Sequence, residues 1–367
     1  MSSDFAAGMA EATRMTRDGR VAEATTLIQR LLRGAPAAAP ALSPDAPPPA
    51  EAAPRAAGRR PRLRETLRRL LERSRALDAE EVAPPPPVPA GARFEAGRHE
   101  GALGARDYRL YVPSTPDVAA GPRPMVVMLH GCTQTPDDFA RGTGMNAAAE
   151  AAGCLVLYPA QPSSANPKRC WNWFRPEDQR RDAGEPGQIA ELVRAVVAAE
   201  DVDPARVFVA GLSAGGAAAA ILGAEYPELF AAVGVHSGLP HGAARDVASG
   251  FAAMRLGARG AAAARPTRTI VFHGDADRVV NPANAGALAA QAVAGAEGLD
   301  VSVEQGASGG RDYSRARHAD AEGRVLCESW VVHGAGHAWA GGDDAGSHAD
   351  PLGPDASREM LRFFLEG

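Results

Sequence analysis

The pentapeptide Gly211-Leu212-Ser213-Ala214-Gly215 constrains this chain more than any other stretch. An apolar run at residues 207–210 precedes it, and a run of small residues at 216–222 follows it. A strand that passes through G-x-S-x-G into a helix makes a strained turn, which exposes the serine hydroxyl while the glycines let strand and helix approach closely. We therefore predict that Ser213 is a nucleophile. The alternative is a Gly/Ser-rich turn that matches the pattern by chance.

Short apolar runs alternate with helical patterns on both sides of this turn. Continuous apolar strands that alternate with helices are typical of a largely parallel sheet covered on both faces, so we predict an α/β fold. The expected strands are residues 107–112, 125–129, 155–158, 207–210, 232–236, 269–272 and 329–332, and the expected helices are 189–199, 216–222 and 357–365.

A serine hydroxyl needs a base to take its proton, and the base needs an acid to hold its tautomer. After the strand at 269–272, one polar turn carries both Asp275 and Asp277. We predict Asp277 as the acid, with Asp275 as the competitor that composition cannot separate. After the strand at 329–332, a glycine-rich loop carries His337, the predicted general base. His333 is nearer the strand and is expected to be structural.

Acyl transfer also needs backbone N–H groups that point at the oxyanion. One is expected from Ala214, the residue after the nucleophile, and the other from the loop after the strand at 125–129. We assign the second donor to the Cys132 N–H, with Thr133 in reserve. A further histidine, His348, lies in a loop without such a setting.

Six motifs occur in order between residues 129 and 339. They are LHGCTQ at 129–134, CWNWF at 170–174, GLSAGG at 211–216, VHSG at 235–238, HGDAD at 273–277 and GHAW at 336–339. Together they resemble the poly(3-hydroxybutyrate) depolymerase family of esterases, from about Arg93 to residue 367. The resemblance implies an α/β-hydrolase fold and a serine esterase without metal or cofactor, with Ser213, Asp277 and His337 as its triad.

The substrate stays open, because relatives of this family include feruloyl and acetylxylan esterases. Polyhydroxyalkanoate or its oligomers are the first expectation. A feruloyl, acetylxylan or small-ester carboxylesterase is the second, and a non-catalytic granule-surface protein is the third. Four aromatic residues close to the predicted site would supply an acyl pocket or a polymer platform, or else would only pack beneath a loop: Trp171, Trp173, Phe174 and Trp339.

The N-terminal quarter differs in composition from the rest. We expect a helical hairpin at 1–33, an Ala/Pro-rich linker at 34–58, a basic amphipathic helix at 59–80, a Pro-rich linker at 81–92 and the catalytic domain at 93–367. The basic helix would either pack its leucines on a neighbouring part of the protein or dock on an apolar, negatively charged surface such as a polymer granule.

Charge and hydropathy exclude some classes of protein. The net charge of −5 gives no general attraction to nucleic acid, and no run of 18 apolar residues offers a transmembrane segment. Residues 1–30 lack the pattern of a secretory signal, so we expect a cytoplasmic protein, with an extracellular one as the alternative. The four cysteines are then expected to be reduced, the alternative being a bridge between Cys132 and Cys170.

Overall fold

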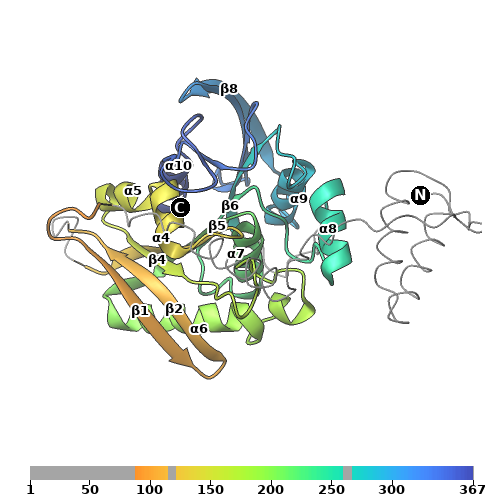
Figure 1. Cartoon of the computed structure of the whole chain (residues 1–367). Coiled ribbons are helices and arrows are strands. Elements are labelled where there is room, and N and C mark those ends of the chain that lie inside the picture. Colours follow the sequence, from red (N-terminus) through yellow and green to blue (C-terminus); the bar gives the residue numbers. More distant parts are fainter. Residues whose placement is uncertain (1–86, 115–120, 259–266, 367) are drawn as a thin grey trace, which may run out of the picture. The chain divides into compact units, whose positions relative to one another are not determined.

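The computed structural model describes residues 87–114, 121–258 and 267–366, and the predictions for residues 1–86 lie outside these ranges. The described part is built around a ten-stranded sheet (Figure 1). In spatial order its strands are β1 (Arg93–Gly101), β2 (Gly104–Val112), β4 (Leu155–Pro159), β3 (Arg123–Leu129), β5 (Val202–Leu212), β6 (Ala232–His236), β7 (Arg268–Gly274), β10 (Val325–Val332), β9 (Arg311–Ala319) and β8 (Asp300–Ser308).

The six central strands, from β4 to β10, are parallel, as their apolar runs predict. An antiparallel hairpin flanks them on each side, β1–β2 at one edge and β9–β8 at the other. In the central register, Gly211 of β5 lies opposite Leu129 of β3 and Val235 of β6. The carboxyl ends of the parallel strands therefore meet at one edge of the sheet, where α/β enzymes place their sites.

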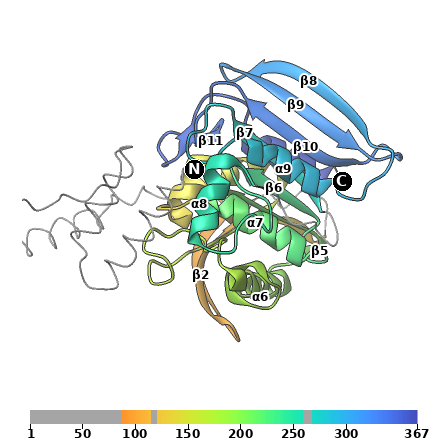
Figure 2. The same cartoon turned by 90° about the vertical axis from the view of Figure 1, so that its right-hand side faces the viewer.

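Helices cover both faces of the sheet, each over its own apolar core (Figures 1 and 2). On one face lie α6 (Gly184–Ala199), α7 (Ala214–Glu225), α8 (Val247–Leu256) and α9 (Ala283–Ala292). On the other lie α4 (Pro136–Thr143), α5 (Met145–Ala152) and α10 (Ala356–Leu365). Short elements complete the described part: η1 (Pro176–Gln179), β11 (Trp339–Ala340) and β12 (Ala349–Asp350).

The last helix shows how sequence fixes this packing. Helix α10 begins at the cap of Asp355, whose side chain accepts the N–H of Arg358, and its apolar face points at the sheet. The Phe364 ring stacks on Phe208 of β5, with their centroids 4.9 Å apart. Gly234 of β6 leaves room for α10, because a Cβ there would lie 2.8 Å from the Met360 sulfur and 3.1 Å from the Phe364 ring.

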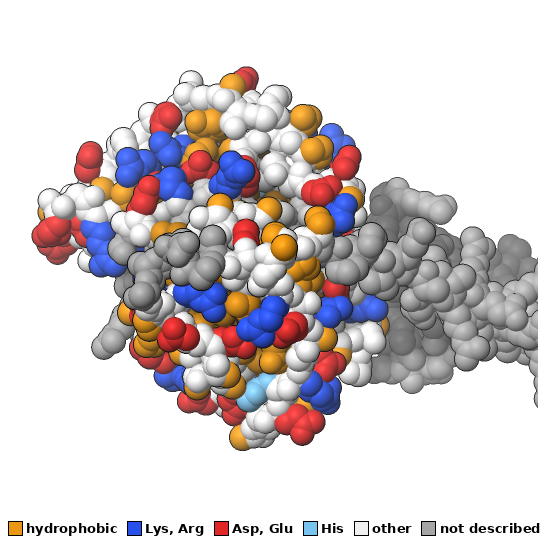
Figure 3. Space-filling model, turned by 90° about the vertical axis from the view of Figure 1, so that its left-hand side faces the viewer, with side chains coloured by type: hydrophobic (Ala, Val, Ile, Leu, Met, Phe, Trp, Pro, Cys, Tyr) orange, Lys and Arg blue, Asp and Glu red, His pale blue; other side chains and the backbone are white. Residues whose placement is uncertain are grey.

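Acidic and basic side chains are interspersed on the face seen from the β1–β2 side (Figure 3). Within the three described ranges, no helix has the length and apolar character needed to cross a membrane.

Candidate active site

Ser213 occupies the sharp turn between β5 and α7. Its backbone has φ 57° and ψ −118°, a strained conformation for a residue with a side chain, and its N–H donates to the carbonyl of His236 at 2.9 Å. Gly215 is required beside it, because a Cβ at this position would overlap the backbone carbonyls of Leu129 and His130. The G-x-S-x-G turn thus has the geometry of a nucleophile elbow.

Asp277 and His337 come together from two neighbouring strand ends. Asp277 follows β7 and His337 follows β10, and the His337 Nδ1–H donates to Asp277 Oδ2 at 2.7 Å. The other oxygen, Asp277 Oδ1, accepts the backbone N–H groups of Val279 and Val280 at 2.8 and 2.9 Å. The carboxylate is thereby fixed in one orientation, with one face left for an imidazole.

The surroundings of Asp277 keep it ionised. Burial alone would raise the pKa of this carboxyl group, but hydrogen bonds from His273 and His337 outweigh the burial and hold the pKa well below its usual range. His273 is itself buried and approaches Asp277 Oδ2 with its Nε2 at 3.4 Å. An ionised acid holds the Nδ1–H tautomer of His337, which leaves Nε2 free to accept a proton.

The loop that carries His337 is anchored on a buried histidine, His236. The Ala340 N–H donates to His236 Nε2 at 3.0 Å, and the Trp339 ring stacks on the His236 ring with centroids 5.0 Å apart. Burial lowers the pKa of His236 to about 3, with the neighbouring His273 and His337 adding to the effect. His236 is therefore neutral and acts as a fixed acceptor beneath the loop.

In the structure His337 is hydrogen-bonded to Asp277 but not to Ser213. Among the described residues, the Ser213 hydroxyl makes no hydrogen bond to His337. The two residues follow β5 and β10, which are separated in the sheet by β6 and β7. Such contacts are often long in enzymes and tighten when a substrate binds.

The predicted oxyanion donors lie at the same edge of the sheet. The Ala214 N–H is the first of α7, and the Cys132 N–H lies in the loop after β3; neither has an acceptor within the described part of the chain. The alternative donor, the Thr133 N–H, already donates to the Lys168 carbonyl at 2.6 Å. This difference favours Cys132 over Thr133 as the second donor.

The expectation of reduced cysteines is wrong for two of the four. Cys132 and Cys170 form a disulfide, which ties the oxyanion loop to the segment that precedes Trp171. Cys154 and Cys327 are free and buried. The pair lies close because the Thr133 N–H bond to Lys168 already draws the two segments together.

A buried polar network beneath this loop was not predicted. The His130 carbonyl accepts the Trp171 Nε1–H at 3.0 Å, and His130 Nε2 accepts the Gln161 N–H at 3.1 Å. Burial lowers the pKa of His130 to about 4, so the ring stays neutral. Glu185 accepts the backbone N–H of Asn172 at 2.8 Å. Isolated polar residues in a sequence do not reveal such a network, because its members come from four separate segments.

The second carboxylate of the turn has a different partner. Asp275 Oδ2 accepts from His333 Nδ1 at 2.8 Å, and Asp275 Oδ1 accepts the Gly334 N–H at 2.7 Å. This pair is exposed, whereas the side chain of Asp277 is completely buried. The geometry therefore assigns His337 to Asp277 alone.

Comparison with known proteins identifies the family of this chain. Residues 106–313 match the family described as Esterase PHB depolymerase. The chain belongs to this family. It is 32% identical over 229 residues to a poly(3-hydroxyalkanoate) depolymerase C of Paucimonas lemoignei, covering 58% of this chain and 54% of the relative. It is 30% identical over 261 residues to a poly(3-hydroxybutyrate) depolymerase of Ralstonia pickettii, covering 64% and 52%. The chain thus spans about half the length of these curated relatives.

A solved structure supports the fold of this Esterase PHB depolymerase member. An acetyl xylan esterase from Aspergillus awamori superposes with a TM-score of 0.55 at 21% identity, covering 75% of this chain and 99% of that one. At this level of identity the likeness concerns the fold alone. The predicted α/β-hydrolase fold is confirmed.

The four aromatic residues predicted to bind substrate do not share one environment in this family member. Trp171 and Trp339 are fully buried, and their indole N–H groups donate to the His130 carbonyl and the Ser357 hydroxyl. As placed, they support the loops of the site and offer no face to a ligand. Trp173 is 7% exposed and Phe174 is half-buried, and both lie against Gly250 of α8.

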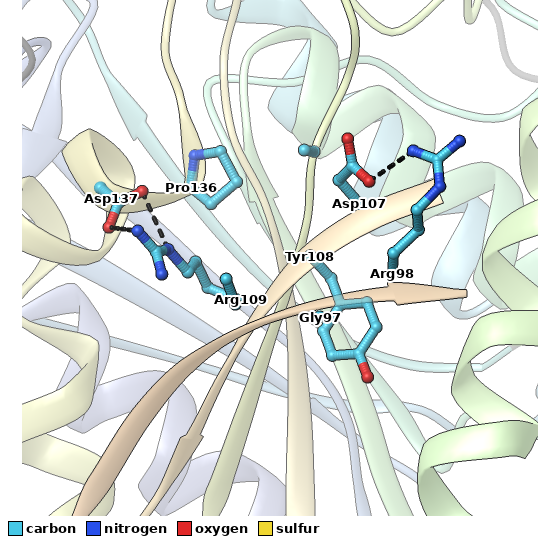
Figure 4. A pocket seen from close by; sticks show the side chains of 9 residues that line it. Gly97, Arg98, Asp107, Tyr108, Arg109, Pro136 and Asp137 are labelled. Atoms are coloured by element: carbon cyan, nitrogen blue, oxygen red, sulfur yellow. Dashed lines mark hydrogen bonds and ion pairs between the residues drawn. The ribbon is translucent and has the colours of Figure 1, made fainter. Parts of the chain in front are cut away.

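A surface hollow of about 500 Å³ lies where β1 and β2 meet the first turn of α4 (Figure 4). None of the predicted site residues lines it. Its charged groups are already paired, Arg98 with Asp107 at 2.6 Å and Arg109 with Asp137 at 3.1 Å. Across residues 87–114, 121–258 and 267–366, no group of three or more His, Cys, Asp or Glu side chains is arranged to hold a metal ion.

Proposed function

We propose that this protein is a serine esterase that hydrolyses polyhydroxyalkanoate, such as poly(3-hydroxybutyrate), or its oligomers through an acyl-enzyme on Ser213. The observation that carries the proposal is the hydrogen bond of His337 to the buried Asp277, at the same sheet edge as the strained Ser213 turn. Membership of the Esterase PHB depolymerase family and the printed names of the two bacterial relatives support the substrate class.

The mechanism is two-step acyl transfer. His337 Nε2 takes the proton of the Ser213 hydroxyl as the oxygen attacks the ester carbonyl, and the carbonyl oxygen becomes an oxyanion held by the N–H groups of Ala214 and Cys132. His337 then gives its proton to the leaving alkoxide. In the second step His337 deprotonates a water molecule, which attacks the acyl-enzyme and releases the hydroxy acid.

Exposed apolar side chains near the site favour a water-insoluble substrate. Val247 and Phe251 are one turn apart on α8, with 56% and 60% of their surface exposed, and Val279 beside the acid is 49% exposed. Helix α8 is tied to the acid loop, because the Asn281 N–H donates to the Met254 carbonyl at 2.7 Å. Large apolar groups on a surface mark contact sites for apolar partners, and an aliphatic polyester is such a partner.

The predicted helix at 59–80 would give this surface a second anchor. Its leucines, Leu63, Leu67, Leu70 and Leu71, would insert between polymer chains while its arginines face an anionic coat. The cellular location is part of the proposal. The Cys132–Cys170 bridge favours an oxidising compartment, such as the outside of the cell, over the cytoplasm predicted from residues 1–30.

The proposal is tested by hydrolysis of three substrates by the full chain and by Ser213→Ala: amorphous polyhydroxybutyrate granules, soluble 3-hydroxybutyrate oligomers and methyl ferulate. We expect release of hydroxybutyrate by the full chain and none by the variant, whose thermal unfolding should be unchanged. Activity on methyl ferulate alone would instead identify a feruloyl-type esterase. Binding to granules without any hydrolysis would identify a non-catalytic surface protein.

A further inference from the structure

A second Ser-His-Asp array lies outside the site described above. His333 Nε2 accepts from the Ser314 hydroxyl at 2.9 Å, and the opposite ring nitrogen, Nδ1, donates to Asp275 Oδ2 at 2.8 Å. The Gly334 N–H fixes the other carboxylate oxygen at 2.7 Å. All the side-chain contacts of a nucleophilic triad are therefore formed here, whereas Ser213 has no hydrogen bond to His337.

Three different elements bring these side chains together. Ser314 belongs to β9, His333 follows the end of β10, and Asp275 follows β7. Ser314 lies opposite Val331 in the register, and the His333 N–H donates to the Asp312 carbonyl, so Ser314 and His333 are on the same face of the sheet. The side chains of His333 and Asp275 are each 43% exposed, so small molecules in solution reach them.

The hydrogen bonds fix the direction of proton transfer. Asp275 is ionised, and the bond from His333 is the largest cause that lowers the pKa of this carboxyl group. An ionised acceptor selects the Nδ1–H tautomer of His333, so that Nε2 is an acceptor and the Ser314 hydroxyl is its donor. This is the arrangement that activates a serine hydroxyl as a nucleophile.

We propose that Ser314, His333 and Asp275 form a second nucleophilic site, which accepts activated acyl or phosphonyl groups on the Ser314 hydroxyl. The Ser314 oxygen bonds to the carbonyl carbon or to phosphorus, and the nitrophenolate or fluoride leaving group departs with its electron pair. The hydroxyl proton passes to His333 Nε2 and from there to solvent.

The backbone around Ser314 limits this site to adduct formation. The N–H groups of His333 and Gly334 are already committed to Asp312 and Asp275, so they cannot serve an oxyanion as the Ala214 and Cys132 groups can. Loss of a single oxyanion donor costs about 100- to 1,000-fold in rate. Ser314 therefore reacts with activated donors, and its adduct turns over slowly.

The test uses the full chain carrying Ser213→Ala, treated with a small alkyl fluorophosphonate and, separately, with p-nitrophenyl acetate. Peptide mass spectrometry locates the adduct and compares Ser314 with Ser302, an exposed serine of the neighbouring strand β8. Because a histidine base typically contributes at least about 100-fold, and exposure weakens it, we expect labelling of Ser314 about tenfold or more above Ser302.

Two further variants in the Ser213→Ala background test whether labelling of Ser314 depends on His333 and Asp275 or only on the exposure of Ser314. His333→Gln and Asp275→Asn should each reduce labelling of Ser314 to the level of Ser302, with unchanged thermal unfolding. Equal labelling of the two serines, or labelling of Ser314 that survives His333→Gln, would overturn the proposal. These labelling results do not test the role of Ser213, because Ser213 is absent from all of these variants. Its esterase activity is measured separately in the unsubstituted chain.

Discussion

Asp275 and Asp277 lie two residues apart in one turn, yet each holds a different histidine. Asp277 is buried and accepts hydrogen bonds from His337 and from two backbone N–H groups, and His273 Nε2 lies 3.4 Å from its Oδ2. Asp275 is exposed and is bonded by His333 and Gly334. Burial strengthens an electrostatic interaction, so the Asp277–His337 pair is the one suited to stabilise an imidazolium during catalysis.

Exchange of each carboxylate for an amide should separate their roles. Asp277→Asn leaves the shape of the site but selects the wrong tautomer of His337, so we expect a loss of about 10⁴-fold in kcat. Asp275→Asn should cost less than about tenfold, because its histidine does not serve Ser213. Steady-state hydrolysis of a soluble 3-hydroxybutyrate oligomer measures both. Equal losses would mean that the acid has been assigned wrongly.

Sequence alone could name the triad candidates but could not separate the two carboxylates. Chain order and strand ends led to Ser213 and His337 as candidates, because the G-x-S-x-G turn and the glycine-rich loop have local signatures. The choice between Asp275 and Asp277 depends on which histidine reaches each oxygen, and that is a property of two loops packed together. The contacts of His236 with Ala340 and of His273 with Asp277 also depend on the packing of distant segments, so the sequence does not reveal them.

At the scale of elements, the bridge between Cys132 and Cys170 constrains the oxyanion loop. It closes a loop with a sequence separation of 38 residues, for which the chain-entropy estimate is a stabilisation of about 4 kcal/mol. The bridge also fixes the segment whose Trp171 supports the carbonyl of His130. The bridge is therefore expected to affect both the stability of the protein and the position of the predicted oxyanion donor.

Replacement of both cysteines, Cys132→Ser with Cys170→Ser, should lower the free energy of unfolding by up to about 4 kcal/mol and reduce kcat. Urea unfolding with and without dithiothreitol measures the first effect. Cys154→Ala is the matched control, because this cysteine is buried but unbridged. Dithiothreitol should still destabilise the control and should leave the double variant unchanged. A double variant as stable as the parent would contradict the prediction.

The stability of the protein should depend on the ionisation of Asp178, a residue of η1 that accepts the Glu185 N–H of α6. Burial, followed by repulsion from Glu185, raises the pKa of Asp178 to about 6. Between about pH 4 and pH 6 the unfolded chain releases this proton while the folded chain keeps it, so stability falls as the pH rises. A shift of about 2 pH units corresponds to about 3 kcal/mol.

Asp178→Asn should therefore stabilise the protein at pH 8 and have little effect at pH 4. The amide oxygen can still accept the Glu185 N–H, which donates to Asp178 Oδ1 at 2.8 Å. The expected gain in the free energy of unfolding at pH 8 is up to about 3 kcal/mol, measured by urea unfolding at the two pH values. The same change at both pH values would show that the charge of Asp178 is not the cause.

The strands that the sequence predicted are the buried ones. Residues 232–236 form β6 as predicted, and the other central strands differ only at their ends. Strands β1, β8 and β9 were not predicted. Two of them, β1 and β8, are the edge strands of the sheet, and β9 lies between β8 and β10. Most residues of β8 are exposed, so the strand lacks the apolar run or strict alternation that identifies a strand. The flanking hairpins are held by pairing with the sheet, which a local pattern does not record.

At the scale of the whole molecule, a solid substrate requires a surface around the site as well as the site itself. Helix α8, which carries exposed apolar residues, lies between the segment that follows Cys170 and the loop that carries Asp277. Gly250 packs on Trp173 and Phe174, which follow the bridged Cys170, and the end of the helix is bonded to Asn281 of the acid loop. A polymer chain that rests on α8 would therefore lie beside the loop that carries Asp277.

Phe251→Ser should weaken binding to polyhydroxybutyrate granules by about tenfold, because burial of a phenylalanine side chain contributes about 1.5–3 kcal/mol. Hydrolysis of soluble oligomers should change far less, since a short soluble chain does not need the exposed surface of α8 for binding. Val303→Ser on β8 is the matched control, because Val303 is 66% exposed but belongs to the far hairpin. Sedimentation with granules measures binding. Equal effects of the two substitutions would mean that the polymer does not select α8.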